Sequence, residues 1–484
     1  MSLIIPANTL ASGGYAVDNS CRFNGASSDD LERTPSSSGN NTTNTLSFWV
    51  KRSTDDEEDF LVYGDNGSAN RCKITFLPNG KLQINTIVSA SNNLVYETNR
   101  LFRDLSAWYH IVIAFNSTLG TAGDRCRLYV NGVEETSFST ETNMGSSTSN
   151  FLSTASATVY IGSQGTGNYY DGYMAEFVFI DGQQLAPTDF GEFDEDSGIW
   201  KPIDVSGLTF GTNGFYLDFE NSGALGADVS GNTNNFTVNN LTATDQTTDT
   251  CTNNFMTLNP LITLTSTTDN QVYSEGNTVV IPNSTDNYGT AFGTFGATRG
   301  KWYWEAKIIW NGTENNANYP RTIGFMRDDY AFNQSTLGQN ADNSWGVGFA
   351  DLDTDGWGLD HNGNFTAITG ATTLASTKML MFALDLDNGK FYMGYDGTFF
   401  TSGDPTSGST GTGAIATLDA TDLSFNIIPA LTNATNVTYY QMNFGNPAYA
   451  IASSNADGDG FGNFEFAVPS GYFSWCTKNL AEYG

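Results

Sequence analysis

Two short acidic loops carry the ligands that a calcium ion prefers. The first places carboxylates at its first, third and fifth positions and a glycine, Gly356, at its sixth. Oxygens at that spacing can converge on one hard cation, while the glycine permits the sharp turn. The second loop, 455–460, repeats the spacing in part. The sequence therefore predicts Ca²⁺ at Asp351, Asp353 and Asp355 and, with a weaker pattern, at Asp457 and Asp459.

A solvated acidic turn is the alternative for both loops, because Asp and Gly favour turns without any metal. The twelve-residue calcium loop ends on a glutamate, and these two segments have Asn362 and Phe466 at that position. The flanking residues also predict strands, where the twelve-residue loop has helices.

Catalytic residue patterns are weak in this chain. Glu192, Asp194 and Asp196 alternate and could share one strand face, and a glycosidase needs two carboxylates about 5–9 Å apart. They lie between Gly191 and Ser197-Gly198, which favours a solvated loop. His110 lies in a β-rich run, so we expect it to pack on a sheet. The sequence predicts a protein that is not an enzyme.

Composition narrows the class of partner. The chain has 484 residues, 52 acids against 20 bases, a net charge of −32 and 13% aromatic residues. A duplex nucleic-acid binder needs clustered Lys and Arg, so nucleic acid is excluded as a partner, and anionic membranes are disfavoured for the same reason. No apolar run is long enough to insert in a membrane. The five cysteines form no CxxC pair and are expected to be small buried hydrophobes.

The pattern of apolar residues predicts an all-β chain. Period-two or β-rich runs occur at 45–51, 108–115, 125–130, 301–308 and 379–395. Asn131-Gly132 after one of these runs is a strong hairpin signal. The best helical turn is 186–190, where Pro187 stands near a first-turn position.

A change of composition suggests where two domains meet. Residues 221–298 are rich in Asn, Thr, Gly and Asp and hold few apolar runs. We expect a first sandwich domain at 1–220, a connector at 221–250 and a second sandwich domain at 251–484. Jelly-roll or sandwich architecture is the economical solution for so many strands.

The first domain resembles the laminin-G-like, concanavalin A-like jelly rolls. The matching stretches are Leu46–Lys51, Trp108–Val112, Leu128–Gly132 and Tyr160–Gly162 leading to Tyr170–Phe177. The second domain resembles a SPRY domain, through Gly300–Glu305, Ile323–Phe325, Asp385–Tyr392 and Asn443–Gly445. It departs from that pattern in the acidic loop after Gly348 and in the Gly/Thr tract at 402–414.

The pairing of these domains is similar to virion proteins of marine tailed phages. The stretches that carry this likeness are Ile4–Leu10, Phe179–Gln183 and Gly191–Asp196. The resemblance implies a fibre or decoration on the tail or head. The opening residues show no signal peptide, which agrees with synthesis in the host cytoplasm and a final place on the virion surface. Other virion proteins are the implied partners, and a homo-oligomer is expected.

Carbohydrate binding is the natural role for a sandwich of this type. Sugars stack on exposed aromatic faces, so the candidate residues are aromatics near Gly-rich or acidic loops. The alternative is that each of these rings packs inside a sheet. The candidates are Tyr169, Tyr170, Tyr173, Trp345 and Trp357.

The sequence therefore predicts a non-enzymatic virion protein whose lectin-like domains bind a host-surface glycan or receptor. A purely architectural cement protein of the capsid or tail is the first alternative. A polysaccharide depolymerase that uses acids near Glu192 or Asp351 is the second.

Overall fold

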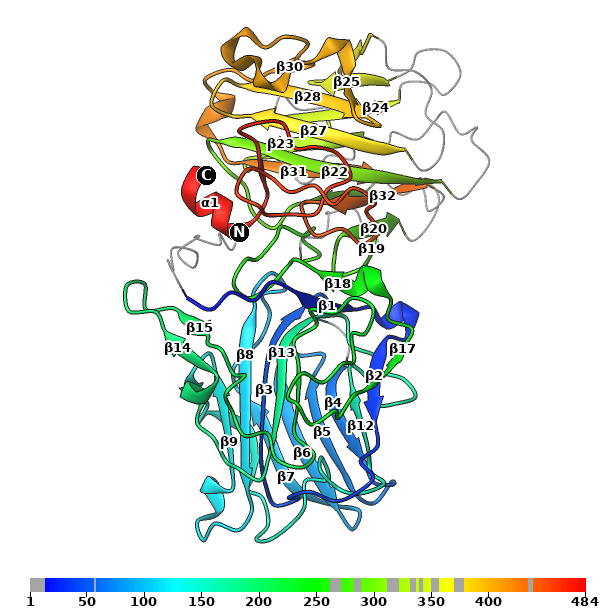
Figure 1. Cartoon of the computed structure of the whole chain (residues 1–484). Helices are drawn as coiled ribbons and strands as arrows, with labels where there is room; N and C mark the ends of the chain where they lie inside the picture. The colour runs from blue at the N-terminus through cyan, green and yellow to red at the C-terminus, as the bar shows by residue number, and fades with distance from the viewer. Residues whose placement is uncertain are drawn as a thin grey trace. The chain divides into compact units, whose positions relative to one another are not determined.

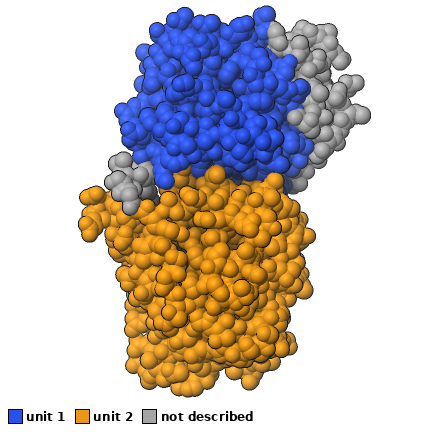
Figure 2. All heavy atoms as spheres, viewed as in Figure 1, with its two compact units in different colours: residues 1–9, 255–484 blue, residues 10–254 orange. Residues whose placement is uncertain are grey.

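A computed structural model shows an all-β chain with two compact units (Figures 1 and 2). The first unit along the chain, Leu10–Asn254, is orange in Figure 2, and the second unit, Phe255–Gly484, is blue. The predicted all-β class and tandem sandwich architecture are confirmed. The structure describes residues 14–55, 58–261, 271–282, 289–310, 322–330, 337–338, 343–349, 357–369, 378–433 and 438–484.

The first unit is a sandwich of two antiparallel sheets. Sheet A has the order β10-β9-β8-β3-β13-β1-β18, with β16 also paired to β13. Its strands are β1 (Ser20–Phe23), β3 (Thr43–Arg52), β8 (Tyr109–Asn116), β9 (Cys126–Val130), β10 (Val133–Glu134), β13 (Gly172–Asp181), β16 (Phe215–Leu217) and β18 (Gln246–Thr247).

Sheet B has the order β11-β7-β6-β5-β4-β12-β2-β17 and covers one face of sheet A. Its strands are β2 (Asp30–Arg33), β4 (Asp59–Asp65), β5 (Arg71–Phe76), β6 (Leu82–Val88), β7 (Ser91–Thr98), β11 (Phe138–Thr142), β12 (Thr158–Ile161) and β17 (Thr237–Asn239).

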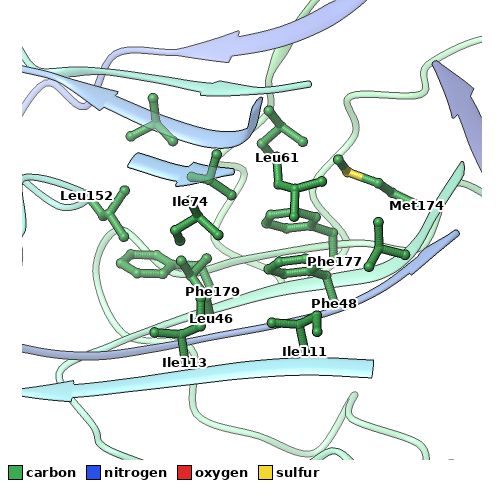
Figure 3. Packing of buried hydrophobic residues seen from close by; sticks show 14 of the residues in the cluster. Leu46, Phe48, Leu61, Ile74, Ile111, Ile113, Leu152, Met174, Phe177 and Phe179 are labelled. Carbon is green, nitrogen blue, oxygen red and sulfur yellow. The ribbon is translucent and has the colours of Figure 1, made fainter. Parts of the chain in front are cut away.

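Alternating side chains explain why the two sheets close on each other. In β3, Leu46 and Phe48 point inward and meet Ile74 of sheet B in one core (Figure 3). Phe48 stacks on Phe177 of β13, with ring centroids 4.9 Å apart. Because successive side chains of a strand point to opposite faces, Ser47 and Trp49 must then face outward.

The outer face of sheet A is also covered, so its central strands are buried on both sides. Val178 and Ile180 of β13 pack beneath Phe190 and Phe210 from later in the chain. In a second cluster, Trp49 and Ala175 of the sheet pack beneath the covering residues Val17 and Trp200. Polar side chains of the outer face are therefore enclosed and need partners.

A buried ion pair ties the end of the first unit to sheet A. The Lys51 ammonium lies 2.7 Å from Asp249 Oδ2 and donates to Asn254 Oδ1 at 2.7 Å. Trp108 Nε1 donates to the other oxygen of Asp249. Both charged side chains are almost completely buried.

The segment 221–250, predicted as a connector, is instead part of the first sandwich. Its β17 pairs with β2, and its β18 pairs with β1. The first unit therefore runs to Asn254, some way beyond the predicted boundary at 220. Composition misled here because short Asn/Thr-rich strands gain their stability from pairing and buried polar bonds rather than from apolar runs.

The second unit also contains two antiparallel sheets. The larger has the order β19-β20-β32-β22-β27-β28-β29, with β30 paired to β28 and β33 to β22. Its strands are β19 (Gln271–Ser274), β20 (Val279–Pro282), β22 (Lys301–Trp310), β27 (Met379–Asp385), β28 (Lys390–Tyr395), β29 (Thr398–Phe399), β30 (Ala416–Thr417), β32 (Thr438–Asn443) and β33 (Phe473–Ser474).

The smaller sheet has the order β21-β31-β23-β24-β25-β26. Its strands are β21 (Gly289–Phe292), β23 (Thr322–Arg327), β24 (Ser344–Phe349), β25 (Trp357–His361), β26 (Asn364–Ala367) and β31 (Ile427–Asn433). Phe325 of this sheet meets Phe391 of the larger one at 4.8 Å between ring centroids. The chain ends in the helix α1 (Thr477–Tyr483).

A buried carboxylate holds the C-terminal segment of this unit in place. Glu305 accepts hydrogen bonds from the backbone N–H groups of Glu465 and Phe466 and from the Tyr303 hydroxyl. Trp475 of this segment is buried and stacks on Trp302 inside the core.

Local signals were mostly reliable. Asn131 and Gly132 both have positive φ, as the hairpin turn between β9 and β10 requires. The turn at Pro187–Asp189 forms as predicted, and Asp189 caps it by accepting from the Ala186 N–H. The cysteines are free thiols, four of them buried. Among the residues described, no helix is both long and apolar enough to cross a membrane.

Removal of one member of the buried ion pair should destabilise the first unit. We expect Lys51→Met to lower its free energy of unfolding by about 3 kcal/mol, because Asp249 is left charged and buried. Urea unfolding, with hydrogen exchange at residues 246–254, measures this. The control Arg127→Met removes the exposed contacts with Asp124 and Glu134 and should cost less than about 1 kcal/mol. Equal losses in the two variants would contradict the tethering role of Lys51.

Candidate binding site on the first unit

A two-stranded hairpin carries an exposed aromatic side chain on the first unit. Its strands β14 (Gly191–Phe193) and β15 (Trp200–Pro202) pair only with each other among the described residues. Phe193 lies opposite Trp200 in the register. The two rings meet edge to face, with centroids 4.9 Å apart.

Trp200 anchors the hairpin to sheet A. Its indole N–H donates to His110 Nδ1 at 2.8 Å, and His110 Nε2 lies 2.8 Å from the Ser47 hydroxyl. An indole nitrogen only donates, so Nδ1 accepts and the proton of neutral His110 belongs on Nε2. Trp49 stacks on the same imidazole at 4.7 Å.

Burial keeps this histidine neutral. His110 is almost inaccessible to solvent, and desolvation of the charged form lowers its pKa to about 3. The expectation of a sheet-face role for His110 is confirmed, and its ring acts as a fixed connection between Ser47 and Trp200.

Glycines allow the Trp200 ring to lie close to the backbone. A Cβ atom on Gly132 would stand 2.2 Å from the ring, and one on Gly191 would stand 2.6 Å from it. Both positions therefore exclude larger residues unless the indole moves. The tryptophan is held from three sides: by the sheet, by the β9–β10 turn and by its own hairpin.

Asp194 shapes the tip of the hairpin. Its Oδ1 accepts from the backbone N–H and the hydroxyl of Ser197, at 2.9 and 2.8 Å, and its Oδ2 accepts from Lys201 Nζ at 3.1 Å. The Ser197 bonds, followed by Lys201, lower the pKa of Asp194 to about 2. Lys201 also lies 3.3 Å from Glu192 Oε1. Asp194 is thus a structural carboxylate.

Several side chains of the hairpin face solvent. Phe193 is 50% exposed, which is unusual for a phenylalanine that neighbours a buried tryptophan. Glu192, Glu195 and Asp196 are also exposed. The hairpin therefore offers one exposed aromatic ring, with exposed carboxylates on neighbouring residues, on a support that is fixed to the sheet. We call this arrangement, residues 191–202, the aromatic hairpin.

A second buried acid lies on the outer face of sheet A. Glu176 occupies a β-bulge in β13 with φ of +49°, and its Oε2 accepts from the Tyr216 and Tyr15 hydroxyls at 2.7 and 3.2 Å. Desolvation raises the pKa of Glu176 to about 7, although the tyrosine bonds oppose this shift. The bulge restores the alternation that sends Met174 and Phe177 into the core.

Four of the five predicted glycan-stacking aromatics are buried, and the expectation that they face solvent is wrong. Tyr170 and Tyr173 have no exposed surface, and Tyr170 donates to the Lys51 carbonyl. Trp345 lies between Phe325 and His361 in the second core, where Trp357 is also buried. Tyr169 is half-buried. A ring enclosed by protein cannot stack on a sugar.

The predicted calcium loops have different outcomes. Asp351, Asp353 and Asp355 lie outside the described residues. Asp457 is buried and accepts bonds from Ser474, Asn479 and the backbone N–H groups of 459 and 461. Asp459 accepts from the Tyr483 hydroxyl. These donors occupy the oxygens a cation would need, so the Asp457 loop does not fit a metal; Asp457 instead fixes the C-terminal segment.

Where the structure describes the chain, no group of three or more His, Cys, Asp or Glu side chains could hold a metal ion. Sequence reasoning also missed Phe193. The signal was available, because an aromatic residue between acids in a predicted solvated loop has no core to enter.

Comparison with known protein families supports the lectin-like assignment of the first unit. Residues 24–186 match the model of the concanavalin A-like lectin/glucanases superfamily. That match covers about a third of the chain and ends just before the aromatic hairpin. No curated protein matches the chain.

Solved structures give distant likenesses. A heptameric SAP-like pentraxin from Limulus polyphemus is 18% identical over 35% of this chain and 78% of its own, with a TM-score of 0.28. The SPRY domain of human HERC1 is 14% identical over 38% and 96%, at 0.26. Domains LG4-5 of the mouse laminin alpha1 chain are 10% identical over 86% and 83%, at 0.28. Likenesses at this level carry no argument about function.

Acid should weaken the first unit through His110. The folded pKa is about 3 and the unfolded value is 6.5, so the unfolded chain binds more protons between these pH values. The stability due to neutral His110 is full above pH 6.5 and is lost towards pH 3, by up to about 1.4 kcal/mol per pH unit. Urea unfolding at pH 6 and pH 4 should show a shallower loss in His110→Gln than in the wild type. Identical pH slopes would contradict this.

Proposed function

We propose that this chain is a non-enzymatic structural protein of a phage virion, a fibre or decoration of the tail or head, whose lectin-like first unit binds a host-surface glycan or receptor. The observation that carries the binding role is the match of residues 24–186 to the concanavalin A-like lectin/glucanases superfamily. Other virion proteins and further copies of the chain are the proposed partners. The proposed location is the virion surface, after synthesis in the host cytoplasm.

The virion role is supported by the likeness of short stretches such as Phe179–Gln183 to phage virion proteins. In the structure, this stretch connects several loops of the first unit. Asp181 accepts from the backbone N–H groups of Asn40 and Asn213 and from the Ser153 hydroxyl, and so joins three loops. A rigid, strongly acidic sandwich is a suitable building block for a particle surface, because its charge opposes aggregation.

The acidic residues of the hairpin do not support the enzyme alternative. Asp194 is committed to the hairpin turn, and Glu192 lies beside Lys201. A glycosidase pair must face each other across a bound sugar, with one carboxyl group held protonated. Asp194, with a pKa of about 2, cannot be that acid near neutral pH. The cement alternative remains open, because an exposed apolar ring also suits a protein interface.

Binding and hydrolysis can be separated in one experiment. The purified chain is applied to a panel of immobilised oligosaccharides, and the bound sugars are then incubated with it and analysed for new reducing ends. We expect retention on at least one sugar and no release of reducing ends. Release of fragments would overturn the non-enzymatic proposal, and retention on no sugar would favour the cement alternative.

Calcium binding remains a proposal for the first acidic loop alone. Isothermal titration with Ca²⁺ should give heat in the wild type and a loss of most of that heat in Asp353→Ala, because one carboxylate ligand is removed. Asp355→Asn keeps the size of the side chain and should weaken binding less. No heat above the buffer blank would contradict a calcium site at this loop.

The location of the first unit in the particle distinguishes a role in host recognition from a purely architectural, cement role. In a reconstruction of the particle that contains it, we expect the first unit to face solvent at the outer surface. Burial of that unit between capsid or tail subunits would support the cement role instead.

A further inference from the structure

We infer that the aromatic hairpin is the sugar-contacting edge of the first unit and that it takes a neutral saccharide, one face of which stacks on Phe193. This inference rests on the proposed glycan-binding function and adds the site and the class of sugar. The hairpin lies beyond the residues that match the lectin superfamily model.

The first support is the exposure of an aromatic ring in a fixed position. Phe193 is half exposed although its partner Trp200 is buried. The contact with Trp200, and through it with His110, restricts the phenyl ring before any ligand arrives. A preorganised ring loses little conformational entropy on binding, which favours affinity. The apolar face of a pyranose is complementary to such a ring.

The second support is the polar surround. A sugar on Phe193 presents hydroxyl groups at its edge, and these need hydrogen-bond acceptors and donors. Glu195 and Asp196 stand exposed at the tip of the hairpin, two and three residues after Phe193. Glu192 and Lys201 pair with each other, so the alternation of strand side chains places them on the opposite face of the hairpin from Phe193. The exposed carboxylates at the tip can accept from sugar hydroxyls.

Charge determines the class of sugar. Of the hairpin's five charged side chains, four are acids and one is the Lys201 cation. Sialic or uronic acid groups bound at Phe193 would lie in the field of those carboxylates and be repelled at moderate salt, where screening extends over about 8–10 Å. A sugar without carboxylate, sulfate or phosphate meets no such penalty. The ligand is therefore a neutral saccharide.

The test compares single-site variants on defined probes. The full chain, its Phe193→Ala variant and its Val229→Ala variant are titrated against neutral gluco-, galacto- and manno-oligosaccharides and against uronic acid oligomers. Val229 is 48% exposed on the same unit and is the matched control. We expect Phe193→Ala to weaken binding of a neutral oligosaccharide about tenfold, the loss typical of one aromatic contact. Val229→Ala should bind as the wild type does.

Further variants separate stacking from folding. Phe193→Tyr and Phe193→Trp keep an aromatic face and should bind within about threefold of the wild type. Unchanged far-ultraviolet circular dichroism in Phe193→Ala would show that the sandwich is intact. If that variant misfolds, the Phe193→Tyr and Phe193→Trp titrations and the neutral-against-uronic comparison still decide the inference.

Each outcome has one meaning. Undiminished binding by well-folded Phe193→Ala would overturn this site and leave the glycan-binding proposal standing. A wild-type preference for uronic acid oligomers would overturn the neutral class. Binding of no saccharide by the wild type would overturn the proposed function itself and this inference with it. Normal glycan binding by Phe193→Ala with reduced incorporation into particles would make the hairpin a protein-docking element.

Discussion

The hydrogen bond from Trp200 to His110 connects the surface of the first unit to its framework. Ser47, His110 and Trp200 form one continuous series of contacts from β3 to the aromatic hairpin. Protonation of His110, or displacement of any of the three side chains, would cost free energy, because the series is enclosed by Trp49 and by the covering segments of sheet A. Because Phe193 contacts Trp200 edge to face, the exposed ring is connected to this buried series.

The other buried polar groups of this unit also need hydrogen-bond or ion-pair partners, because solvent does not reach them. Covering the outer face of sheet A places Lys51 in an apolar environment, and the chain supplies Asp249 and Asn254 as its partners. Glu176 receives two tyrosine hydroxyls instead of a cation, and the raised pKa of its carboxyl reflects that weaker compensation. The segment 246–254 is therefore an integral layer of the sandwich, held by directional bonds where its sequence offers few apolar residues.

Strand positions were predictable because they depend on local alternation. The runs that became β3, β8, β22 and β27 could be identified from period-two patterns, and the Asn131-Gly132 turn from its need for positive φ. Exposure of single aromatics was not predictable, because it depends on which segments cover a sheet. Tyr173 and Trp345 lie near glycine-rich or acidic loops and are nevertheless buried, whereas Phe193 lies in a two-stranded extension that nothing covers among the described residues.

The many acidic side chains have different effects in the interior of the protein and on its surface. Buried carboxylates such as Asp457, Glu305 and Asp249 each organise a loop or a strand pair through several donors. Exposed carboxylates such as Asp404 and Asp419 cap only local turns, because solvent competes for every bond, and the exposed acids together act through their field. Around Phe193 that field repels anions while it leaves neutral hydroxyl groups free to donate. The excess of acidic residues excludes nucleic acid as a partner of the whole chain. In the same way, the acids near Phe193 disfavour anionic sugars and leave neutral sugars as ligands of this ring.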